Sequence, residues 1–495
     1  MALSHITYGL TSLVLLFAVY LKYSRRSTPV PPGPRSWRIG GVTHLIPKKH
    51  PWLSYARWSE RFGPIISFRV YNQTVVVLND TKAVHELLDK RQAFYSDRPR
   101  SWMLHDLCGR ANTVFNISAT NDRHRKYRTL LRGGLSPQAT LSYAPLLECE
   151  LADLVTRLND SPALYREHIR RNAAAIIMRV AYGYTVAKDN DLFVRTAEEA
   201  SQISGLAMAP GRWLVNYFPL LRFVPGWFPG AGFQRQAAIW RKELDKLSGV
   251  PHQWVRDQMA AGIDNDCFTT RLLKPSSGKV ASVDEEDIIK WAAGGLYAGA
   301  ADTTFSALVS FILLMAVHPD VQDRARAEIL ELTGADRLPF VSDIPQFHYL
   351  SAVLKEVLRF APVAPLALPH QVTQEDEYGG YRIPKNATVM ANVWSIMHDE
   401  TLYPDPYTFD PSRFIPVKSG DSLQPDPRGY SFGFGRRTCP GSHFAETSML
   451  LIMAGILLKF DISSSRPRPA IHPLEFTSGI TSHIKPFDIN IVSRK

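Results

Sequence analysis

Cysteine is scarce in this sequence of 495 residues, which contains only Cys108, Cys149, Cys267 and Cys439. Four widely spaced cysteines provide neither a disulfide framework nor the paired spacing of a zinc cluster. A reducing compartment is therefore the expected setting for the folded part of the chain.

Long basic runs are also lacking, although the formal net charge is +11. Lysine and arginine do not form runs with interleaved aromatic residues, so we expect no nucleic-acid partner. An anionic membrane surface or an acidic protein partner accounts for the charge more simply. Hydrophobic residues make up 45% of the chain and charged residues 21%, as in a globular protein without long disordered spans.

The first charged side chain after the N-terminus is Lys22. Twenty apolar or uncharged residues in a helix extend about 30 Å, enough to cross the core of a bilayer. A cleaved signal peptide is the alternative, but the segment has no basic n-region and no clear cleavage site. Arg25 and Arg26 follow Lys22 at once, and positive flanks stay in the cytosol.

We therefore expect three parts in the chain. Residues 1–22 form a transmembrane anchor, and residues 23–40 form a basic hinge that proline makes stiff. Residues 41–495 form the folded part, whose length allows one large domain or several ordinary ones.

One cysteine, Cys439, lies among glycines and arginines, directly before an apolar segment at 442–460 that is typical of a helix. Glycines let backbone N–H groups approach a sulfur closely, and the start of a helix favours a thiolate. Pro440 fits the first turn of that helix, and Arg437 suits an anionic group beside a metal. A buried free cysteine is the alternative, but the combined pattern predicts a metal ligand.

The pattern Phe432-x-x-Gly435-x-Arg437-x-Cys439-x-Gly441 resembles the haem-binding loop of the cytochrome P450 monooxygenases. The resemblance implies that the Cys439 thiolate is the proximal iron ligand of haem b, iron protoporphyrin IX, where its electron donation favours O–O cleavage. It implies that the other four motif residues surround the cofactor. The fold implied is one large, mainly α domain with small β-sheets, preceded by a transmembrane helix.

A long helix is predicted to begin at the capping box 282–285 and to end at His318. Asp302 is its only charged residue between 291 and 317, so a second membrane span has to be considered. The polar residues at mid-length, with Gly294, Gly295 and Gly299, favour instead a buried helix that passes a large flat cofactor.

The resemblance extends to the middle of this helix. The family has an acid followed by an alcohol there, and this chain has Asp302 and Thr303. In the family the threonine hydroxyl donates a hydrogen bond to bound dioxygen, and the acid connects it to a proton supply. Ala300 stands where glycine is usual, which alters the groove beside the oxygen.

Several basic residues are implied to bind the haem propionates. His124 and Arg128 occupy the positions of a family Trp-x-x-x-Arg pair on one helix face. His370 ends an extended, proline-rich segment that passes the haem edge in the family, with a surface histidine as the alternative. The remaining cations at 123–132 suit either docking of an acidic electron donor or a plain solvated face.

Other family positions concern stability and substrate. Glu356, Arg359 and Arg413 are expected to form a buried ion network. The aromatic segment 211–233 is expected either at a membrane interface or in the core. The substrate pocket is expected to include Ala300, Val363, Ala364, Leu366 and Ile480.

The function implied is insertion of one oxygen atom from dioxygen into a mostly hydrophobic small molecule, in secondary or xenobiotic metabolism of a fungal type. Electrons would come from NADPH through NADPH-cytochrome reductase, with cytochrome b5 as a further donor. The enzyme would be a single-pass protein of the endoplasmic reticulum membrane that faces the cytosol. Two alternatives remain: a haem-thiolate isomerase or dehydratase, and a membrane-anchored haem or ligand carrier without turnover.

Overall fold

The computed structural model describes residues 28–186, 191–263, 265–274, 281–416, 423–464 and 476–494. The expected anchor at 1–22 and the start of the hinge lie outside these residues. Residues 28–37, the next part of the hinge, form neither helix nor strand. The described chain is mainly helical with small sheets, which confirms that part of the prediction.

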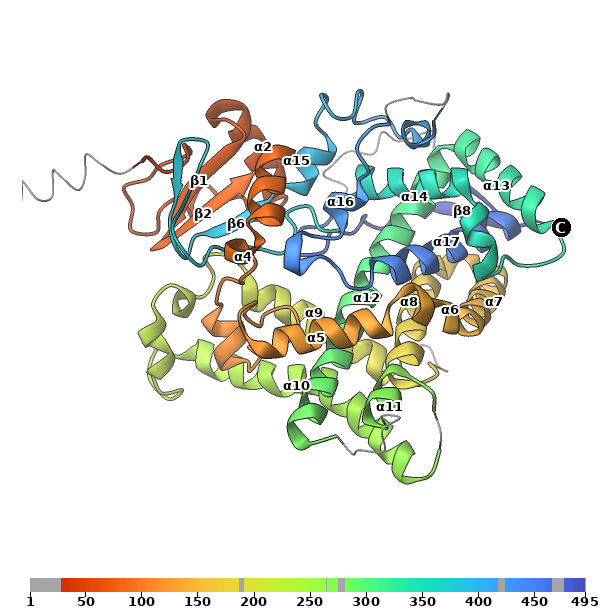
Figure 1. The fold of residues 1–495 in the computed structure, drawn as a ribbon, viewed down its shortest axis with the longest axis horizontal. Coiled ribbons are helices and arrows are strands. Elements are labelled where there is room, and N and C mark those ends of the chain that lie inside the picture. Colours follow the sequence, from red (N-terminus) through yellow and green to blue (C-terminus); the bar gives the residue numbers. More distant parts are fainter. Residues whose placement is uncertain are drawn as a thin grey trace, which may run out of the picture.

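The largest sheet lies at one side of the molecule, with α2 (Pro51–Phe62) and α15 (Val393–Met397) beside it (Figure 1). Its strands follow the order β1 (Ile65–Val70), β2 (Gln73–Leu78), β6 (Thr388–Ala391) and β3 (His370–Gln371). β2 and β6 run parallel, whereas the other two pairings are antiparallel. Valine-rich β2 suits this central position because both of its faces are packed: Val76 and Leu78 belong to one apolar cluster, and Val75 and Val77 belong to another.

Two further pairs of strands are antiparallel: β4 (Asp376–Tyr378) with β5 (Tyr381–Ile383), and β7 (Phe460–Ser464) with β8 (Ile489–Ser493). The remaining helices carry most of the chain. They are α3 (Thr81–Val84), α4 (Gln92–Tyr95), α5 (Asp122–Gly134), α6 (Pro137–Ser142), α7 (Ala144–Asp160), α8 (Tyr165–Tyr182), α9 (Leu192–Met208), α10 (Gly232–Ala260), α11 (Phe268–Leu273), α12 (Val283–Val317), α13 (Pro319–Thr333), α14 (His348–Phe360), α16 (Arg428–Ser431) and α17 (Ser442–Lys459).

Short turns of other helix types join these elements. η1 (His85–Lys90) and η2 (Trp102–Leu107) are π-helical. The 3-10 turns are η3 (Pro162–Leu164), η4 (Leu214–Asn216), η5 (Pro219–Phe223), η6 (Val341–Gln346), η7 (Pro411–Phe414) and η8 (Gly435–Arg437).

Helix α12 passes through the middle of the molecule and packs against α8, α10 and α14 (Figure 1). It begins at the predicted capping box, in which the Ser282 hydroxyl and the Glu285 carboxylate each accept the other's backbone N–H. Every residue from Phe305 to Val317 is buried. Among the described helices, α12 is the one long and apolar enough to cross a membrane, and its burial identifies it as a core helix.

The glycines of α12 have a different role from the predicted one. A Cβ atom on Gly294 would lie 2.7 Å from Ser248 of α10, and one on Gly295 would lie 2.6 Å from Val114. These contacts show that glycine admits neighbouring protein segments to the helix. The prediction that all three glycines face a flat cofactor is therefore wrong for these two.

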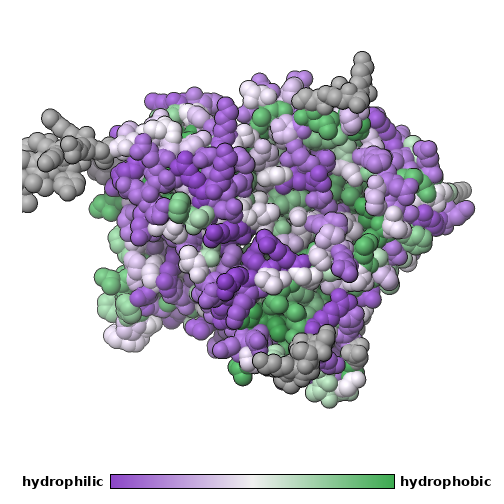
Figure 2. All heavy atoms as spheres, viewed as in Figure 1, coloured by the Kyte–Doolittle hydropathy of each residue, from purple (hydrophilic) through white to green (hydrophobic). Residues whose placement is uncertain are grey.

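The aromatic segment 211–233 divides between core and surface. Tyr217 is buried, with its ring 4.6 Å from that of Tyr71. Three other apolar side chains of the segment are largely exposed: Leu220 by 80%, Phe223 by 68% and Trp227 by 80%. Figure 2 shows apolar side chains at the edge of the molecule where Figure 1 draws the segment between α9 and α10.

Candidate functional site

Cys439 lies in the turn between α16 and α17. Its backbone N–H donates to the Phe432 carbonyl at 2.7 Å, which closes the loop on itself. The Gly441 N–H acts on the Cys439 sulfur and lowers the pKa of the thiol, which fits a glycine that lets the backbone come close. Because α17 begins at Ser442, Pro440 precedes the helix and does not occupy its first turn. The prediction for Pro440 is wrong in this respect.

The glycine at 435 fastens this loop to the neighbouring turn η1. Gly435 has a φ of 51°, and a Cβ atom there would lie 2.4 Å from the Leu88 carbonyl oxygen. Its N–H donates to Asp89 Oδ1 at 2.9 Å. A larger residue would be strained in this conformation and would collide with the backbone.

The environment of Cys439 suits a metal with few protein ligands. Burial raises the pKa of the Cys439 thiol, whereas the Gly441 N–H and the Arg128 charge oppose that rise. No group of three or more His, Cys, Asp or Glu side chains that could hold a metal ion occurs in the described chain. A metal bound to Cys439 would therefore need most of its ligands from a non-protein group, as haem iron has.

Three arginines lie near this loop with their guanidinium groups turned inward. Arg437 Nε donates to the Ser96 carbonyl at 2.7 Å, and Arg128 Nη1 donates to the Thr438 carbonyl at 2.6 Å. Arg98 donates to the carbonyl oxygens of the segment before β3. Burial, followed by repulsion from the charge of Arg437, lowers the pKa of Arg98 to about 9. Burial likewise lowers the pKa of Arg437 to about 10.

Two histidines complete the basic cluster. His370 is 2% exposed, and its Nδ1 lies 2.7 Å from the Tyr95 carbonyl oxygen, so the alternative of a surface histidine is wrong. Burial lowers the pKa of His370 to about 3, helped by the charges of Arg98 and Arg437. Burial, followed by the charge of Arg437, lowers the pKa of His124 to about 4. Both rings are therefore neutral near pH 7.

This cluster fits the acidic edge of a haem. In the described part of the chain, no ion pair joins Arg98, Arg128 or Arg437 to a carboxylate. The charge of Asp97 acts on Arg98 and Arg437, where it opposes the fall in pKa. Arg128 Nε is buried without a hydrogen-bond partner. Buried cations need anionic partners, so the cluster suits two carboxylates supplied by a bound group. Arg98 was missed by the sequence analysis, because nothing local distinguishes it from a surface arginine.

The acid and alcohol at the middle of α12 lie in a stretch, 298–304, where the burial of the helix is interrupted. Between Ile288 and Val317, only Ala298 and Thr303 are exposed. Thr303 Oγ1 donates to the Gly299 carbonyl at 2.8 Å. Asp302 Oδ1 lies 3.3 Å from His483 Nε2, on the last loop of the described chain. Burial raises the pKa of Asp302, but hydrogen bonds and charges from His483, Thr481 and Arg170 bring it below its ordinary value.

The predicted pocket residues divide into two groups. Ala300 and Val363 pack against the main helical core, and the Val363 carbonyl accepts the Ser482 N–H at 2.8 Å. This bond places Val363 beside the loop that carries Ile480, which is 37% exposed. Leu366 packs instead against the cluster around β1 and β2. Ala364 accepts the N–H of Ala367 in a tight turn between the two groups.

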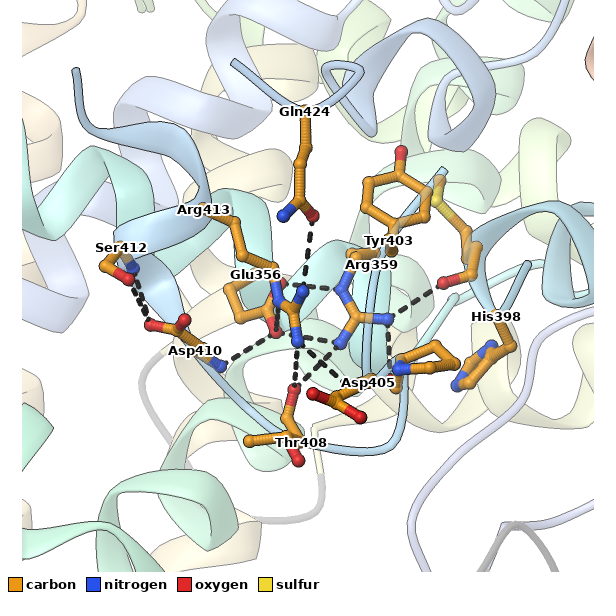
Figure 3. Close-up of polar contacts among 12 residues, drawn as sticks. Glu356, Arg359, His398, Tyr403, Asp405, Thr408, Asp410, Ser412, Arg413 and Gln424 are labelled. Carbon is orange, nitrogen blue, oxygen red and sulfur yellow. Dashed lines mark hydrogen bonds and ion pairs between the residues drawn. The ribbon is translucent and has the colours of Figure 1, made fainter. Parts of the chain in front are cut away.

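Glu356, Arg359 and Arg413 lie together in the interior (Figure 3). Arg359 forms a bidentate pair with Glu356, from Nε at 2.7 Å and from Nη2 at 2.8 Å. Arg413 Nε lies 3.5 Å from Glu356 Oε1, and the remaining N–H groups of the two arginines reach backbone carbonyls at 397–408. The network thereby joins α14 to η7 and to the segment between them.

Comparison with known proteins identifies the family of this chain. The sequence model of the Cytochrome P450 family matches residues 31–491. Cytochrome P450 monooxygenase claR of Ampulloclitocybe clavipes is 36% identical over 99% of this chain and 91% of that protein. Cytochrome P450 monooxygenase 208 of Postia placenta is 36% identical, over 97% and 94%. O-methylsterigmatocystin oxidoreductase of Aspergillus flavus is 35% identical, over 94% and 88%. The chain therefore belongs to the cytochrome P450 family and is an oxidoreductase of the monooxygenase class.

Proposed function

We propose that this enzyme inserts one oxygen atom from dioxygen into a mostly hydrophobic small organic molecule. The observation that carries the proposal is that the chain has both a cysteine loop and two polar residues at the middle of the buried helix α12. The half-buried Cys439 loop is closed by the bond from the Cys439 N–H to the Phe432 carbonyl, and Asp302 and Thr303 lie in the stretch 298–304, where the burial of α12 is interrupted. A purely structural core helix would have no reason to hold an ionised acid at this position.

The residues around Cys439 would hold a haem. Cys439 is the iron ligand, with Phe432, Gly435 and Gly441 shaping its loop. Arg98, Arg128 and Arg437, with neutral His124 and His370, would hold the two propionates. When bound, the haem supplies dioxygen binding and activation, which no side chain can supply.

On the α12 side of the site, the chain's own contribution is to hold a hydroxyl next to an acid. The Thr303 hydroxyl donates its hydrogen to the Gly299 carbonyl, so its oxygen is fixed as a hydrogen-bond acceptor. Asp302 carries a negative charge at pH 7, because the partners around it outweigh the effect of its burial. A charged acid next to a fixed hydroxyl can accept and return protons without moving far.

Electrons would come from NADPH through NADPH-cytochrome reductase, with cytochrome b5 as a second donor. Helix α5 offers a basic docking face because Arg125, Lys126 and Arg132 are exposed, and Figure 2 shows hydrophilic side chains where Figure 1 draws α5. Arg123 does not belong to this face, since it pairs with Asp287 of α12. Opposite charge at a docking surface increases the rate of association.

The substrate would reach the site from a membrane. Residues 1–22 would anchor the enzyme in the endoplasmic reticulum with its folded part in the cytosol. Leu220, Phe223 and Trp227 give the surface an exposed apolar patch, and such patches mark contact sites. One fungal relative is named O-methylsterigmatocystin oxidoreductase, after an organic small molecule, which supports a role in secondary or xenobiotic metabolism.

The test is reconstitution of the haem-loaded enzyme with NADPH-cytochrome reductase and a library of apolar compounds. Compounds that shift the haem absorption spectrum are taken as ligands and assayed for an oxygenated product and for NADPH oxidation. Product containing oxygen from labelled dioxygen supports the proposal. Conversion without dioxygen would identify an isomerase or dehydratase. Spectral binding without NADPH oxidation, for every ligand, would identify a carrier.

A further inference from the structure

We propose that His483 is the positioning residue for Asp302 and passes it the proton that the distal site uses. This inference rests on the proposed oxygenation and on the role of Asp302 in it. The observation that carries it is the approach of His483 Nε2 to within 3.3 Å of Asp302 Oδ1, across 181 residues of sequence (483 − 302).

His483 is held in this place from both sides. Its backbone N–H donates to the Thr477 hydroxyl at 3.0 Å, and its carbonyl accepts the Thr477 N–H at 2.7 Å. The preceding residue, Ser482, accepts the Ser306 hydroxyl through its carbonyl oxygen and donates its N–H to Val363. Ser306 lies one helical turn after Asp302, so the loop is fixed to the same part of α12 that the imidazole contacts.

The next residue fixes the other side of the histidine. The carbonyl of Ile484 accepts Arg166 Nη2 of α8 at 3.3 Å, and Ile484 also bridges to Phe476. The imidazole ring lies 5.7 Å from the Phe305 ring. A side chain held by its backbone, its neighbours and an aromatic ring loses little further entropy when it binds the acid.

Other charged groups face this pair, and none of them can replace His483. Arg170 lies over the Phe305 ring, 4.3 Å from its centroid, and pairs with Glu198 at 2.8 Å. Arg166 also lies near Phe305, at 5.6 Å. Lys485 is exposed, two residues further along the loop. An arginine stays protonated at any pH at which the enzyme works, so neither arginine can deliver a proton.

The imidazole contacts the acid through one of its two nitrogens. Nε2 lies against Asp302, whereas Nδ1 is buried and has no hydrogen-bond partner in the described chain, so Nδ1 keeps its hydrogen throughout. In the proposed step the Nε2–H bond of the imidazolium breaks and the proton passes to Asp302 Oδ1. A hydronium ion of the solvent then returns a proton to Nε2 and leaves water, so charge and protons balance. The side chain is 22% exposed, which allows this exchange at Nε2.

The contact itself is tested without turnover. Melting temperatures of the haem-loaded enzyme are compared for Asp302→Ala, His483→Ala and the double variant. Because the two side chains interact, His483→Ala should lower the melting temperature of the Asp302→Ala variant by less than it lowers that of the wild type, by about half or less. Strictly additive effects would show that the two residues do not interact and would overturn the proposal.

The proton transfer is tested with His483→Gln, which keeps an N–H near Asp302 but cannot titrate. Product formed per NADPH, with the strongest ligand from the spectral library, should fall roughly tenfold in this variant. Lys485→Gln, on the same loop, is the matched control and should retain the wild-type yield.

The outcomes separate this inference from the proposed function. If Asp302→Asn and Thr303→Ala leave the yield unchanged, the distal pair has no role and the proposed function fails. If those variants lose yield but His483→Gln behaves as the wild type, only the role of His483 fails. If His483→Gln retains its melting temperature and haem content but loses yield, the role is more than structural.

Discussion

Glu356 Oε2 accepts Arg359 Nε at 2.7 Å, and both side chains are completely shielded from solvent. Burial raises the pKa of the Glu356 carboxyl, and the hydrogen bonds of Arg359 oppose that rise. The pair therefore matters for stability because each charge depends on the other. Glu356→Gln would leave two buried arginines without a negative partner. We expect it to lower the free energy of unfolding by about 3–5 kcal/mol.

The measurement for this change is chemical denaturation of the haem-loaded enzyme. Arg428→Gln is the matched control, since Arg428 also pairs with acids, Asp426 and Glu446, but is 41% exposed. An exposed pair contributes about 0–1 kcal/mol. Equal losses in the two variants would contradict the assignment of the interior network as the more important one.

Cys439→Ser is expected to abolish the red-shifted absorption of the reduced carbon monoxide complex. A serine hydroxyl would not act as the thiolate ligand that produces this band. The variant should still fold, because the Cys439 N–H bond to Phe432 involves only the backbone. Absorption spectra of the reduced protein with and without carbon monoxide provide the measurement. Persistence of the band would show that another residue ligates the iron.

Arg128→Leu is expected to reduce the haem content of the purified protein by several-fold. The substitution removes the cation whose Nε is buried without a partner, and with it one hydrogen bond to a propionate. A hydrogen bond between charged groups contributes about 1.5–3 kcal/mol. Haem is measured as a pyridine complex relative to protein. Arg132→Leu, one turn further along α5 and exposed, should retain full haem content; equal loss there would contradict a specific role for Arg128.

Local patterns in the sequence predicted the elements that position the site. The capping box at Ser282 specified the start of α12, because it satisfies the first N–H groups of a helix by local contacts alone. The glycines around Cys439 predicted a loop with close backbone approach, and the structure adds that Gly435 has a positive φ, which the spacing alone did not indicate. Both features depend on residues a few positions apart, which is the range at which sequence patterns carry information.

Contacts between distant segments could not be predicted in this way. Arg123 was grouped with the exposed cations of α5, yet it pairs with Asp287, 164 residues later. Gly294 and Gly295 were assigned to a cofactor face, whereas Ser248 and Val114 pack against them. In each case the local sequence fits several partners, and only the arrangement of helices selects one.

Replacing Phe223 and Trp227 together by serine is expected to weaken binding of the enzyme to lipid vesicles, when residues 1–22 are removed. The two side chains are 68% and 80% exposed, and aromatic residues favour the membrane interface. Burial of apolar area contributes about 25 cal/mol per Å², so two such side chains should reduce binding more than tenfold. Vesicle sedimentation measures the bound fraction. Val492→Ser, at another exposed apolar position, should bind as the parent; equal binding by all three proteins would exclude this patch as the membrane contact.

Thr303→Ala is expected to divert electrons from product to hydrogen peroxide. The Thr303 hydroxyl is held by the Gly299 carbonyl, so its removal takes away a fixed hydroxyl without disturbing the helix. Loss of a group that assists proton transfer typically reduces the assisted step about 10²–10⁴-fold, whereas NADPH oxidation should continue. Thr304→Ala removes the same group one residue along, about 100° around the helix, and should keep the wild-type ratio of peroxide to product. Because both variants lose one hydroxyl and one methyl group, a difference between them reports on position alone. Equal ratios in the two variants would mean that the proton reaches the oxygen by another route.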